Sequence, residues 1–154
     1  MSERGPGWIQ TFTGRQFWPG LPMARDVDIL DIAHALSNTC RFAGHCRTFY
    51  SVAEHSVRLA ETLAPEEQLW GLLHDAAEAY VLDLPRPIKH DQRMREYRWM
   101  ERNVDQAIRI KFRLFGDPPP SVKVADNRML FTEKRDLIAI STHEDWDDPY
   151  PPFG

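Results

Sequence analysis

A stretch in the middle of the chain, residues 72–80, most limits the folds open to this sequence. Apolar residues recur in and just before it at three- and four-residue spacing, which is typical of a helix with one buried face. The predicted buried face consists of Leu69, Leu72, Leu73, Ala76, Ala77 and Tyr80. His74 and Glu78 share one side of this helix, and Asp75 lies beside them. A carboxylate near an apolar face is costly unless a cation or a hydrogen-bond donor compensates it, so the stretch predicts either a polar rim or a metal site.

The composition is that of an ordinary soluble domain. A chain of 154 residues predicts one domain, residues 1–154, with a single core. No apolar run approaches the roughly 20 residues of a membrane span, and the N-terminus lacks the apolar segment of a secretory signal, so we expect a cytoplasmic protein without membrane contact. The net charge of −4 argues against binding to duplex nucleic acid. Cys40 and Cys46 fit no redox motif, and we expect free thiols.

The order of patterns along the chain predicts a mostly α fold. Residues 1–25 form a hairpin and linker, because aromatic and β-branched residues alternate over residues 8–18. Residues 26–140 form a helical core, a bundle of five or six helices, and residues 141–154 an extended tail. Helix starts are predicted after Asp26 or Asp28, after Ser51, at Pro65, at Asp91 and after Asp117 or Ser121. The helix from Asp91 is predicted to reach Phe115, and residues 37–50 to form a loop.

Two further ligand-type side chains fall on predicted apolar stripes. His55 lies three residues after Val52, and Asp126 lies three residues before Met129. With His74 and Asp75, they bring two imidazoles and two carboxylates inward from three helices. Such a set suits zinc, manganese, cobalt or iron with positions left open, which is typical of a catalytic site.

Three other polar residues, His34, Arg41 and Arg47, each allow two interpretations. The lone His34 is either a packing residue or a neighbour of the site. Arg41 and Arg47, in the predicted loop, would suit a phosphate through their paired donors, or they are solvated surface charges.

The order His, then His-Asp, then Asp resembles the HD-domain metal-dependent phosphohydrolases, a mostly helical superfamily. Residues 51–56, 74–78, 83–89 and 122–126 look like blocks of its bacterial 5'-deoxynucleotidases. Residues 31–34 and 40–42, with the short length, look closer to its phage members, including the dATP triphosphohydrolases. The resemblance spans roughly residues 28–130 and implies a helical HD-domain bundle, in the host cytoplasm if a phage encodes it.

The resemblance assigns roles residue by residue. It implies that the metal ligands are His55, His74, Asp75 and Asp126. Glu78 matches the catalytic acid, which would act beside Asp75. The remaining matches are expected to bind the substrate: Arg41, Phe42, Arg47, Asp83, Lys89 and Lys123. Phe42 stands where the deoxynucleotidases have tryptophan, so a ring can still press on a deoxyribose but the indole donor is lost.

The implied reaction is hydrolysis of a 5'-deoxynucleotide between the 5'-oxygen and the α-phosphorus. The first choice is a dATP triphosphohydrolase that releases deoxynucleoside and triphosphate, with magnesium expected on the phosphate tail. The alternatives are a 5'-deoxynucleotidase acting on dNMPs, a catalytically inactive nucleotide-binding sensor and a purely structural helical protein. Five tryptophans and an aromatic tail exceed what one small core hides, so we expect a homo-oligomer whose only other partner is the deoxynucleotide.

Overall fold

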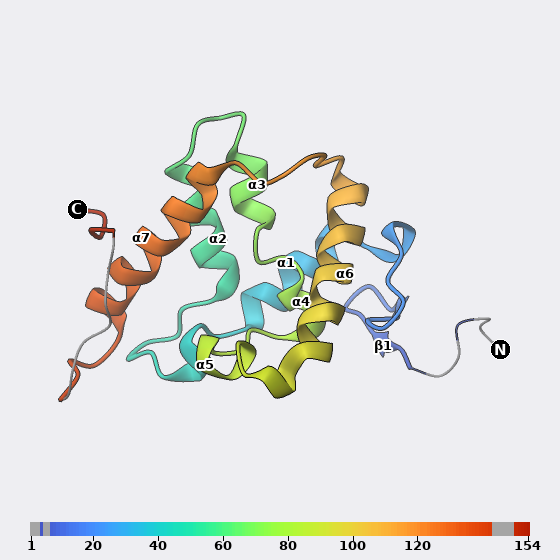
Figure 1. Cartoon of the computed structure of the whole chain (residues 1–154), viewed down its shortest axis with the longest axis horizontal. Helices are drawn as coiled ribbons and strands as arrows, with labels where there is room; N and C mark the ends of the chain where they lie inside the picture. The colour runs from blue at the N-terminus through green and yellow to red at the C-terminus, as the bar shows by residue number, and fades with distance from the viewer. Residues whose placement is uncertain (1–3, 5–6, 143–149) are drawn as a thin grey trace.

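The fold is an assembly of helices with a short antiparallel hairpin near the N-terminus (Figure 1). The computed structural model describes residue 4, residues 7–142 and residues 150–154. The hairpin consists of β1 (Ile9–Gln10) and β2 (Gln16–Phe17). The helices are α1 (Ile29–Asn38), α2 (Val52–Glu61), α3 (Gln68–Leu73), α4 (Glu78–Val81), α5 (Arg86–Lys89), α6 (Arg95–Phe112) and α7 (Pro120–Leu137). The predicted fold class, mostly α with an N-terminal hairpin, is confirmed.

Side-chain caps begin two of the helices where the sequence predicted them. Asp28 accepts a hydrogen bond from the backbone N–H of Leu30 at 2.9 Å and starts α1. Ser51 accepts from the backbone N–H of Glu54 at 3.0 Å and starts α2. Each bond satisfies an N–H group that has no partner inside the helix. These caps fix which residues of α1 and α2 face inward.

The start of α7 differs from the prediction. Neither Asp117 nor Ser121 caps it, because Pro119 occupies the capping position and Pro120 the first helical turn. Proline suits that turn because its φ angle is already helical and it has no N–H group to satisfy. The Ser121 hydroxyl instead donates to Glu67 Oε2 at 2.7 Å and connects the first turn of α7 to the residue before α3.

The predicted continuous helix over the central stretch is interrupted. α3 ends at Leu73, residues 74–77 form turns, and α4 begins at Glu78. The predicted buried face is partly wrong, because Leu69 and Leu72 are 43% and 37% exposed. α3 turns Gly71 and Leu73 toward the interior instead, so Leu69 and Leu72 point outward.

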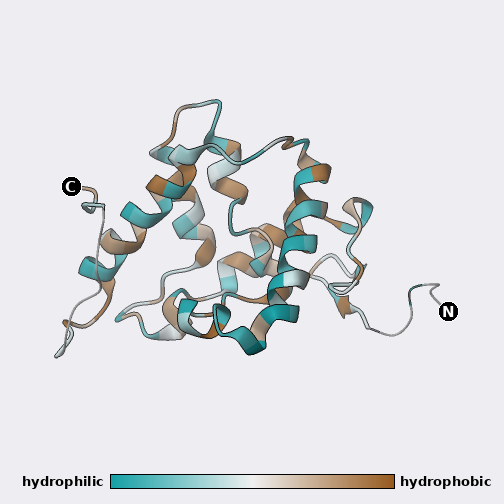
Figure 2. Cartoon of the chain, in the orientation of Figure 1, coloured by the Kyte–Doolittle hydropathy of each residue, from teal (hydrophilic) through white to brown (hydrophobic). Residues whose placement is uncertain are grey.

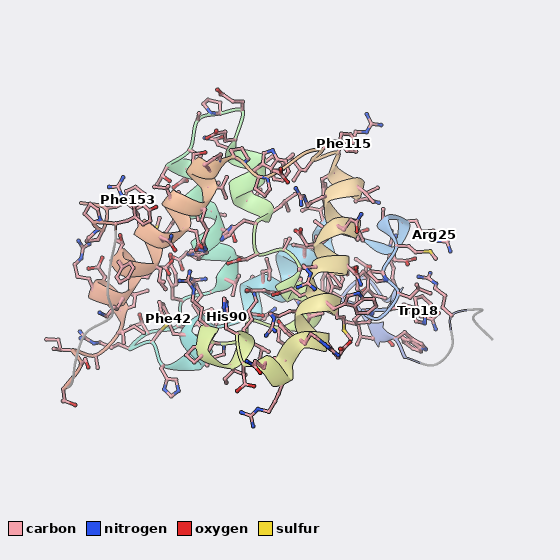
Figure 3. All side chains as sticks on the ribbon, viewed as in Figure 1. Trp18, Arg25, Phe42, His90, Phe115 and Phe153 are labelled. Atoms are coloured by element: carbon pink, nitrogen blue, oxygen red, sulfur yellow. The ribbon has the colours of Figure 1, made fainter. Side chains whose placement is uncertain are left out.

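The long helix predicted in the C-terminal half of the bundle also begins and ends at other residues. The helix predicted over residues 91–115 is shorter, because Asp91 accepts a hydrogen bond from the backbone N–H of Arg93 and starts a separate short turn before α6. At the other end, Arg113 adopts a left-handed conformation (φ 58°) that stops α6. Phe115 therefore lies beyond the helix and is 74% exposed (Figure 3).

The apolar core lies between the hairpin and α1, α2, α3, α4 and α6. Phe17 of the hairpin stacks on Tyr80 of α4 with ring centroids 3.8 Å apart. α6 contributes Val104 and Ile108, both fully buried, and apolar residues alternate with polar ones along this helix (Figure 2). Asp31 of α1 is also buried, and it accepts hydrogen bonds from Thr13 that attach the hairpin. Among the described residues, no helix combines the length and apolar character that crossing a bilayer requires.

The described part of the C-terminal tail lies on α7. The centroid of the Phe153 ring lies 4.0 Å from the Arg128 guanidinium (Figure 3). The backbone N–H of Phe153 donates to the Thr132 hydroxyl at 2.9 Å. This part of the tail therefore packs against the outer side of α7. Trp146 lies outside the described residues. Trp99 is half exposed and Trp18 is buried, and the homo-oligomer stays a prediction.

Gly71 allows α3 to approach α2 closely, and it provides a stability prediction. A Cβ atom at this position would lie 2.5 Å from Leu63 Cδ1 and 2.9 Å from Cδ2 of the fully buried Leu59. We expect Gly71→Ala to lower the melting temperature, because overpacking of about 1–3 kcal/mol exceeds the gain in helix propensity of about 1 kcal/mol. Gly20→Ala, where a Cβ meets no atom within 4 Å, is the control. An unchanged or higher melting temperature for Gly71→Ala would contradict this account of the helix contact.

Candidate metal centre

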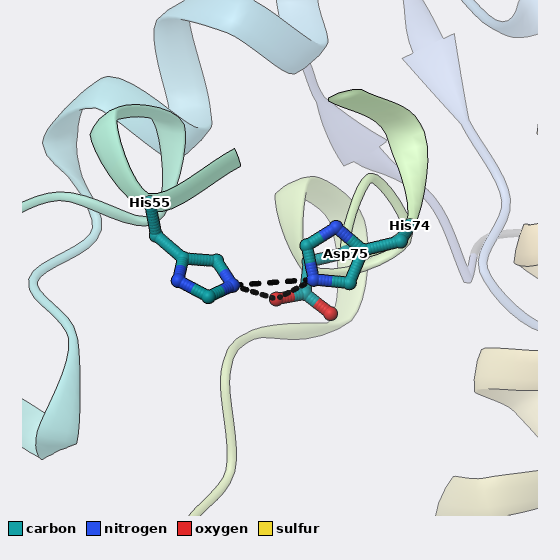
Figure 4. Close-up of side chains that lie close together, drawn as sticks. All are labelled: His55, His74 and Asp75. Carbon is teal, nitrogen blue, oxygen red and sulfur yellow. Dashed lines mark hydrogen bonds and ion pairs between the residues drawn. The ribbon is translucent and has the colours of Figure 1, made fainter. Parts of the chain in front are cut away.

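Three of the four predicted ligands meet at one point in the interior (Figure 4). α2 supplies His55, which is fully buried, and the turn after α3 supplies His74 and Asp75. The two Nε2 atoms lie 3.2 Å apart. Asp75 Oδ2 lies 3.1 Å from Nε2 of His74 and 3.7 Å from Nε2 of His55. The two imidazoles and this carboxylate can hold a metal ion between them.

The fourth predicted ligand approaches the same point from α7. Asp126 Oδ1 lies 3.6 Å from Nε2 of His55 and 3.8 Å from Nε2 of His74. Nitrogen and oxygen ligands lie about 2.0–2.2 Å from zinc, so neighbouring ligands of one tetrahedral ion lie about 3.4 Å apart. The measured separations bracket this value, and the donor set of two imidazoles and two carboxylates fits a divalent ion.

The other ring nitrogen of each histidine is held by an acceptor. His74 Nδ1 donates to the carbonyl oxygen of Gly71 at 2.7 Å, and His55 Nδ1 donates to Glu133 Oε1 at 2.6 Å. A carbonyl or a carboxylate can only accept here, so the hydrogen is on Nδ1 in both rings. Each Nε2 atom is therefore the one left to bind an ion, and an ion that binds there displaces any proton from it.

The two aspartates and His74 shift one another's pKa values. Burial opposes the charged form of His74, but Asp75 and Asp126 outweigh it and raise the pKa of this imidazole to about 9. Burial acts in the opposite direction on Asp75, yet the neighbouring His74 holds the pKa of this carboxyl well below its usual range. Burial acts to raise the pKa of Asp126, but His55, His74 and Lys123 together outweigh it, so this pKa is also lowered. Both carboxylates are therefore charged at neutral pH.

Glu78 lies at the first position of α4 and has an unusual environment. Its side chain is buried, and within the described part of the chain its Oε2 atom has no hydrogen-bond partner. Burial, together with the charges of Asp75 and Asp83, raises the pKa of Glu78 to about 10, so this carboxyl is protonated at neutral pH. It lines a cavity of about 260 Å³ with His74, Asp75 and Lys89. A buried polar atom without a partner beside a cavity indicates a place for a ligand.

Arg41 reaches the centre from the loop after α1, although its side chain is buried. Its Nη1 lies 3.6 Å from Asp75 Oδ2, and its Nε donates to Glu133 Oε2 at 2.9 Å. Its guanidinium lies 5.5 Å from the centroid of the Phe42 ring. Phe42 and Ala43 both have positive φ angles, 54° and 52°, which are rare for residues other than glycine. Such backbone strain is typical of functional loops.

The other residues predicted to bind substrate make contacts in different parts of the structure. Lys89 Nζ lies 2.5 Å from Glu101 Oε1, and Lys123 Nζ donates to Asp126 Oδ2 at 2.9 Å. Asp83 is partly buried, and burial raises its pKa although the charge of Arg41 acts to lower it. Arg47 instead donates to the carbonyl oxygen of Ile138 at 2.8 Å and fastens the loop to the C-terminal end of α7. Its assignment to the substrate stays a prediction. The lone His34 stacks on Phe12 of the hairpin, 3.7 Å between ring centroids.

Two residues of the centre were missed from the sequence. Glu133 is only 3% exposed and bonds both His55 and Arg41. It lies seven residues after Asp126, two helical turns along the same face of α7, and this spacing was the available signal. Arg86, at the start of α5, places Nη2 3.7 Å from Asp126 Oδ2 while its side chain is 56% exposed. No periodic pattern marks Arg86, because the one-turn helix that carries it is too short to show one.

Comparison with known proteins places the chain in a family. No protein-family model matches it. It is 31% identical over 127 residues to an uncharacterized protein of Rhodobacter capsulatus. The aligned region covers 77% of this chain and 64% of that protein. It is 44% identical over 130 residues to the uncharacterized protein YfdR of Escherichia coli (strain K12), which covers 84% of this chain and 72% of that protein. The chain therefore belongs to the same family as the Escherichia coli protein YfdR.

Proposed function

We propose that the protein is a metal-dependent phosphohydrolase that cleaves 5'-deoxynucleotides between the 5'-oxygen and the α-phosphorus. The observation that carries the proposal is the meeting of two histidines and two aspartates beside Glu78, a buried carboxyl whose Oε2 atom has no hydrogen-bond partner among the described residues. A purely structural role does not explain this arrangement, because buried charges and unsatisfied polar atoms lower stability.

The ligand set is His55, His74, Asp75 and Asp126, and the ion is zinc, manganese or cobalt. When bound, such an ion lowers the pKa of water and polarises a phosphoryl oxygen. Glu78 is protonated at neutral pH and faces the same cavity, so it is placed to give a proton to the leaving 5'-oxygen. The two tautomers fixed by Gly71 and Glu133 keep the Nε2 atoms of the histidines turned toward the centre.

Cationic side chains around the ligands support a phosphate as the group that is attacked. Arg41 and Arg86 each place a guanidinium nitrogen within 3.7 Å of a carboxylate oxygen of the ligand set. Lys89 lines the cavity, and Lys123 bonds Asp126 directly. Cations held in place near a reacting phosphoryl group stabilise its charge as it develops. Phe42 lies next to Arg41, where its ring can press on a deoxyribose.

The resemblance ranks dATP first among substrates, with magnesium on the phosphate tail. One observation favours the second candidate, a 5'-deoxynucleotidase acting on dNMPs. Arg41, Lys89 and Lys123 each already pair with a carboxylate. The positive charge that remains suits a single phosphate better than the larger negative charge of a triphosphate. The third candidate, an inactive nucleotide-binding sensor, does not require the buried Glu78.

A substrate panel separates these candidates. The four dNTPs, the dNMPs and ATP are incubated with manganese, cobalt, zinc or magnesium, and the products are resolved by chromatography. We expect deoxyadenosine and triphosphate from dATP, with the Asp126→Ala protein as the blank. Deoxyadenosine from dAMP but not from dATP would replace the first candidate with the second. Binding without any product would favour the sensor, and equal hydrolysis of ATP and dATP would remove the deoxyribose role of Phe42.

A further inference from the structure

We propose that Glu133 is a positioning residue that couples the metal ligand His55 to the phosphate-binding Arg41. The inference rests on the proposed function, because it concerns how the metal centre and the phosphate contact are held together. Glu133 lies on α7, whereas His55 lies on α2 and Arg41 in the loop after α1. One carboxylate therefore joins three separate parts of the chain beside the centre.

The two oxygens of Glu133 are used separately. Oε1 accepts from His55 Nδ1 at 2.6 Å, and Oε2 accepts from Arg41 Nε at 2.9 Å. Tyr50 lies close enough to this carboxylate that burial, together with the charge of Glu133, raises the pKa of the Tyr50 hydroxyl. Both hydrogen-bond partners of Glu133, His55 and Arg41, are buried, so water does not compete for these bonds. Glu133 thus has one arrangement in which every partner is satisfied.

The bond to His55 selects the ring nitrogen that faces the centre. Because Oε1 only accepts, it keeps the hydrogen on Nδ1 and leaves the Nε2 lone pair directed at His74, Asp75 and Asp126. Carboxylates behind a metal-bound histidine orient the ring and increase its basicity, and their loss costs about 10–100-fold in metal affinity or activity. Glu133 occupies this position for His55.

The bond to Arg41 orients the guanidinium. With Nε held by Glu133, Nη1 lies on the side of Asp75, 3.6 Å from its Oδ2. The same carboxylate therefore sets the direction of a phosphate donor and the tautomer of a metal ligand. Glutamine at position 133 has nearly the same shape, but one of its two ends is an N–H₂ donor. It can satisfy His55 or Arg41, and it must present a donor to the other.

The test compares two buried carboxylates in the whole 154-residue chain. Asp31 is 2% exposed and Glu133 is 3% exposed, but Asp31 accepts its hydrogen bonds from Thr13 of the hairpin. Glu133→Gln and Asp31→Asn are compared with the wild type by competition titration of zinc, cobalt and manganese against a chromogenic chelator. We expect a metal Kd roughly 10–100-fold higher for Glu133→Gln. Asp31→Asn is expected to keep the wild-type Kd even if its melting temperature falls.

Each outcome decides between the inference and the proposed function. A wild-type protein that binds none of the three ions overturns the proposed function. A wild type that binds an ion, with Glu133→Gln binding it equally well or Asp31→Asn equally weakened, overturns only the role of Glu133. If Glu133→Gln does not fold, nitrogen-15 NMR of the zinc-loaded wild type gives the answer. A hydrogen on Nδ1 of His55 supports the inference, and its absence overturns it.

Discussion

Alanine at Asp126 is expected to abolish both metal binding and hydrolysis. Asp126 Oδ1 faces the Nε2 atoms of His55 and His74 at 3.6 and 3.8 Å, so its removal opens one side of the ligand set. A ligand that binds only the folded state stabilises it by mass action, by about 2.7 kcal/mol at 100 times the Kd. The variant should therefore lose the rise in melting temperature that added zinc, manganese or cobalt produces. Elemental analysis and thermal melts with and without metal measure the two effects.

The control for this variant is on the same helix. Asp136 is exposed and pairs with its neighbour Arg135, so Asp136→Ala should keep metal, activity and the metal-dependent rise in melting temperature. His55→Ala removes a ligand from a different helix and should behave as Asp126→Ala does. Full metal occupancy in both ligand variants would show that the centre has been assigned to the wrong residues.

Glutamine at Glu78 is expected to keep the ion and reduce turnover by about 10²–10⁴, the usual contribution of a general acid or base. The carboxyl lines the cavity beside Asp75, and its Oε2 atom is unpaired among the described residues. Glutamine has nearly the same shape but cannot release a proton. Steady-state kinetics and elemental analysis on the same preparation measure the two properties. Glu54→Gln, at a partly exposed side chain that pairs with Arg58, is the control.

The same substitution has an expected effect on stability in the metal-free protein. The pKa of Glu78 is raised to about 10 in the folded state, against about 4.3 in an unfolded chain. Between these values the folded state holds a proton that the unfolded state has lost, so stability falls as the pH rises. Glu78→Gln removes this dependence, and at pH 8 it should melt no lower than the wild type. For the catalytic role, a Glu78→Gln protein that lacks metal, or one that is fully active, would refute the proposal that Glu78 is the general acid.

Much of the fold could be predicted because its signals are local. Asp28 and Ser51 cap helices through bonds to residues two and three positions away. The inward direction of His55 follows from its spacing on the apolar stripe of α2, and the structure buries it fully. The approach of His55, His74, Asp75 and Asp126 to one point was predicted from the same spacing on three expected helices, combined with the family resemblance, although His74 and Asp75 lie in a turn. Their binding of an ion stays a prediction.

The remaining features depend on partners far away in the chain. The break at residues 74–77 and the outward direction of Leu69 and Leu72 accompany the close packing of Gly71 against α2, which no local pattern records. The roles of Glu133 and Arg86 depend on contacts with residues 78 and 40 positions away, respectively. Position on a helix face shows that a side chain points inward, but only the packed structure shows which groups it meets.

The position of α7 gives the metal centre a second consequence. The main apolar cluster joins the hairpin to α1, α2, α3, α4 and α6, and among the described residues it includes none from α7. α7 packs beside α2 at one edge of the molecule (Figure 1), yet it carries the proposed ligand Asp126 and also Glu133, which bonds His55. With an ion bound as proposed, its release and the opening of α7 would be linked equilibria. The supply of metal in the cell would set how firmly the C-terminal helix stays closed against the rest of the chain.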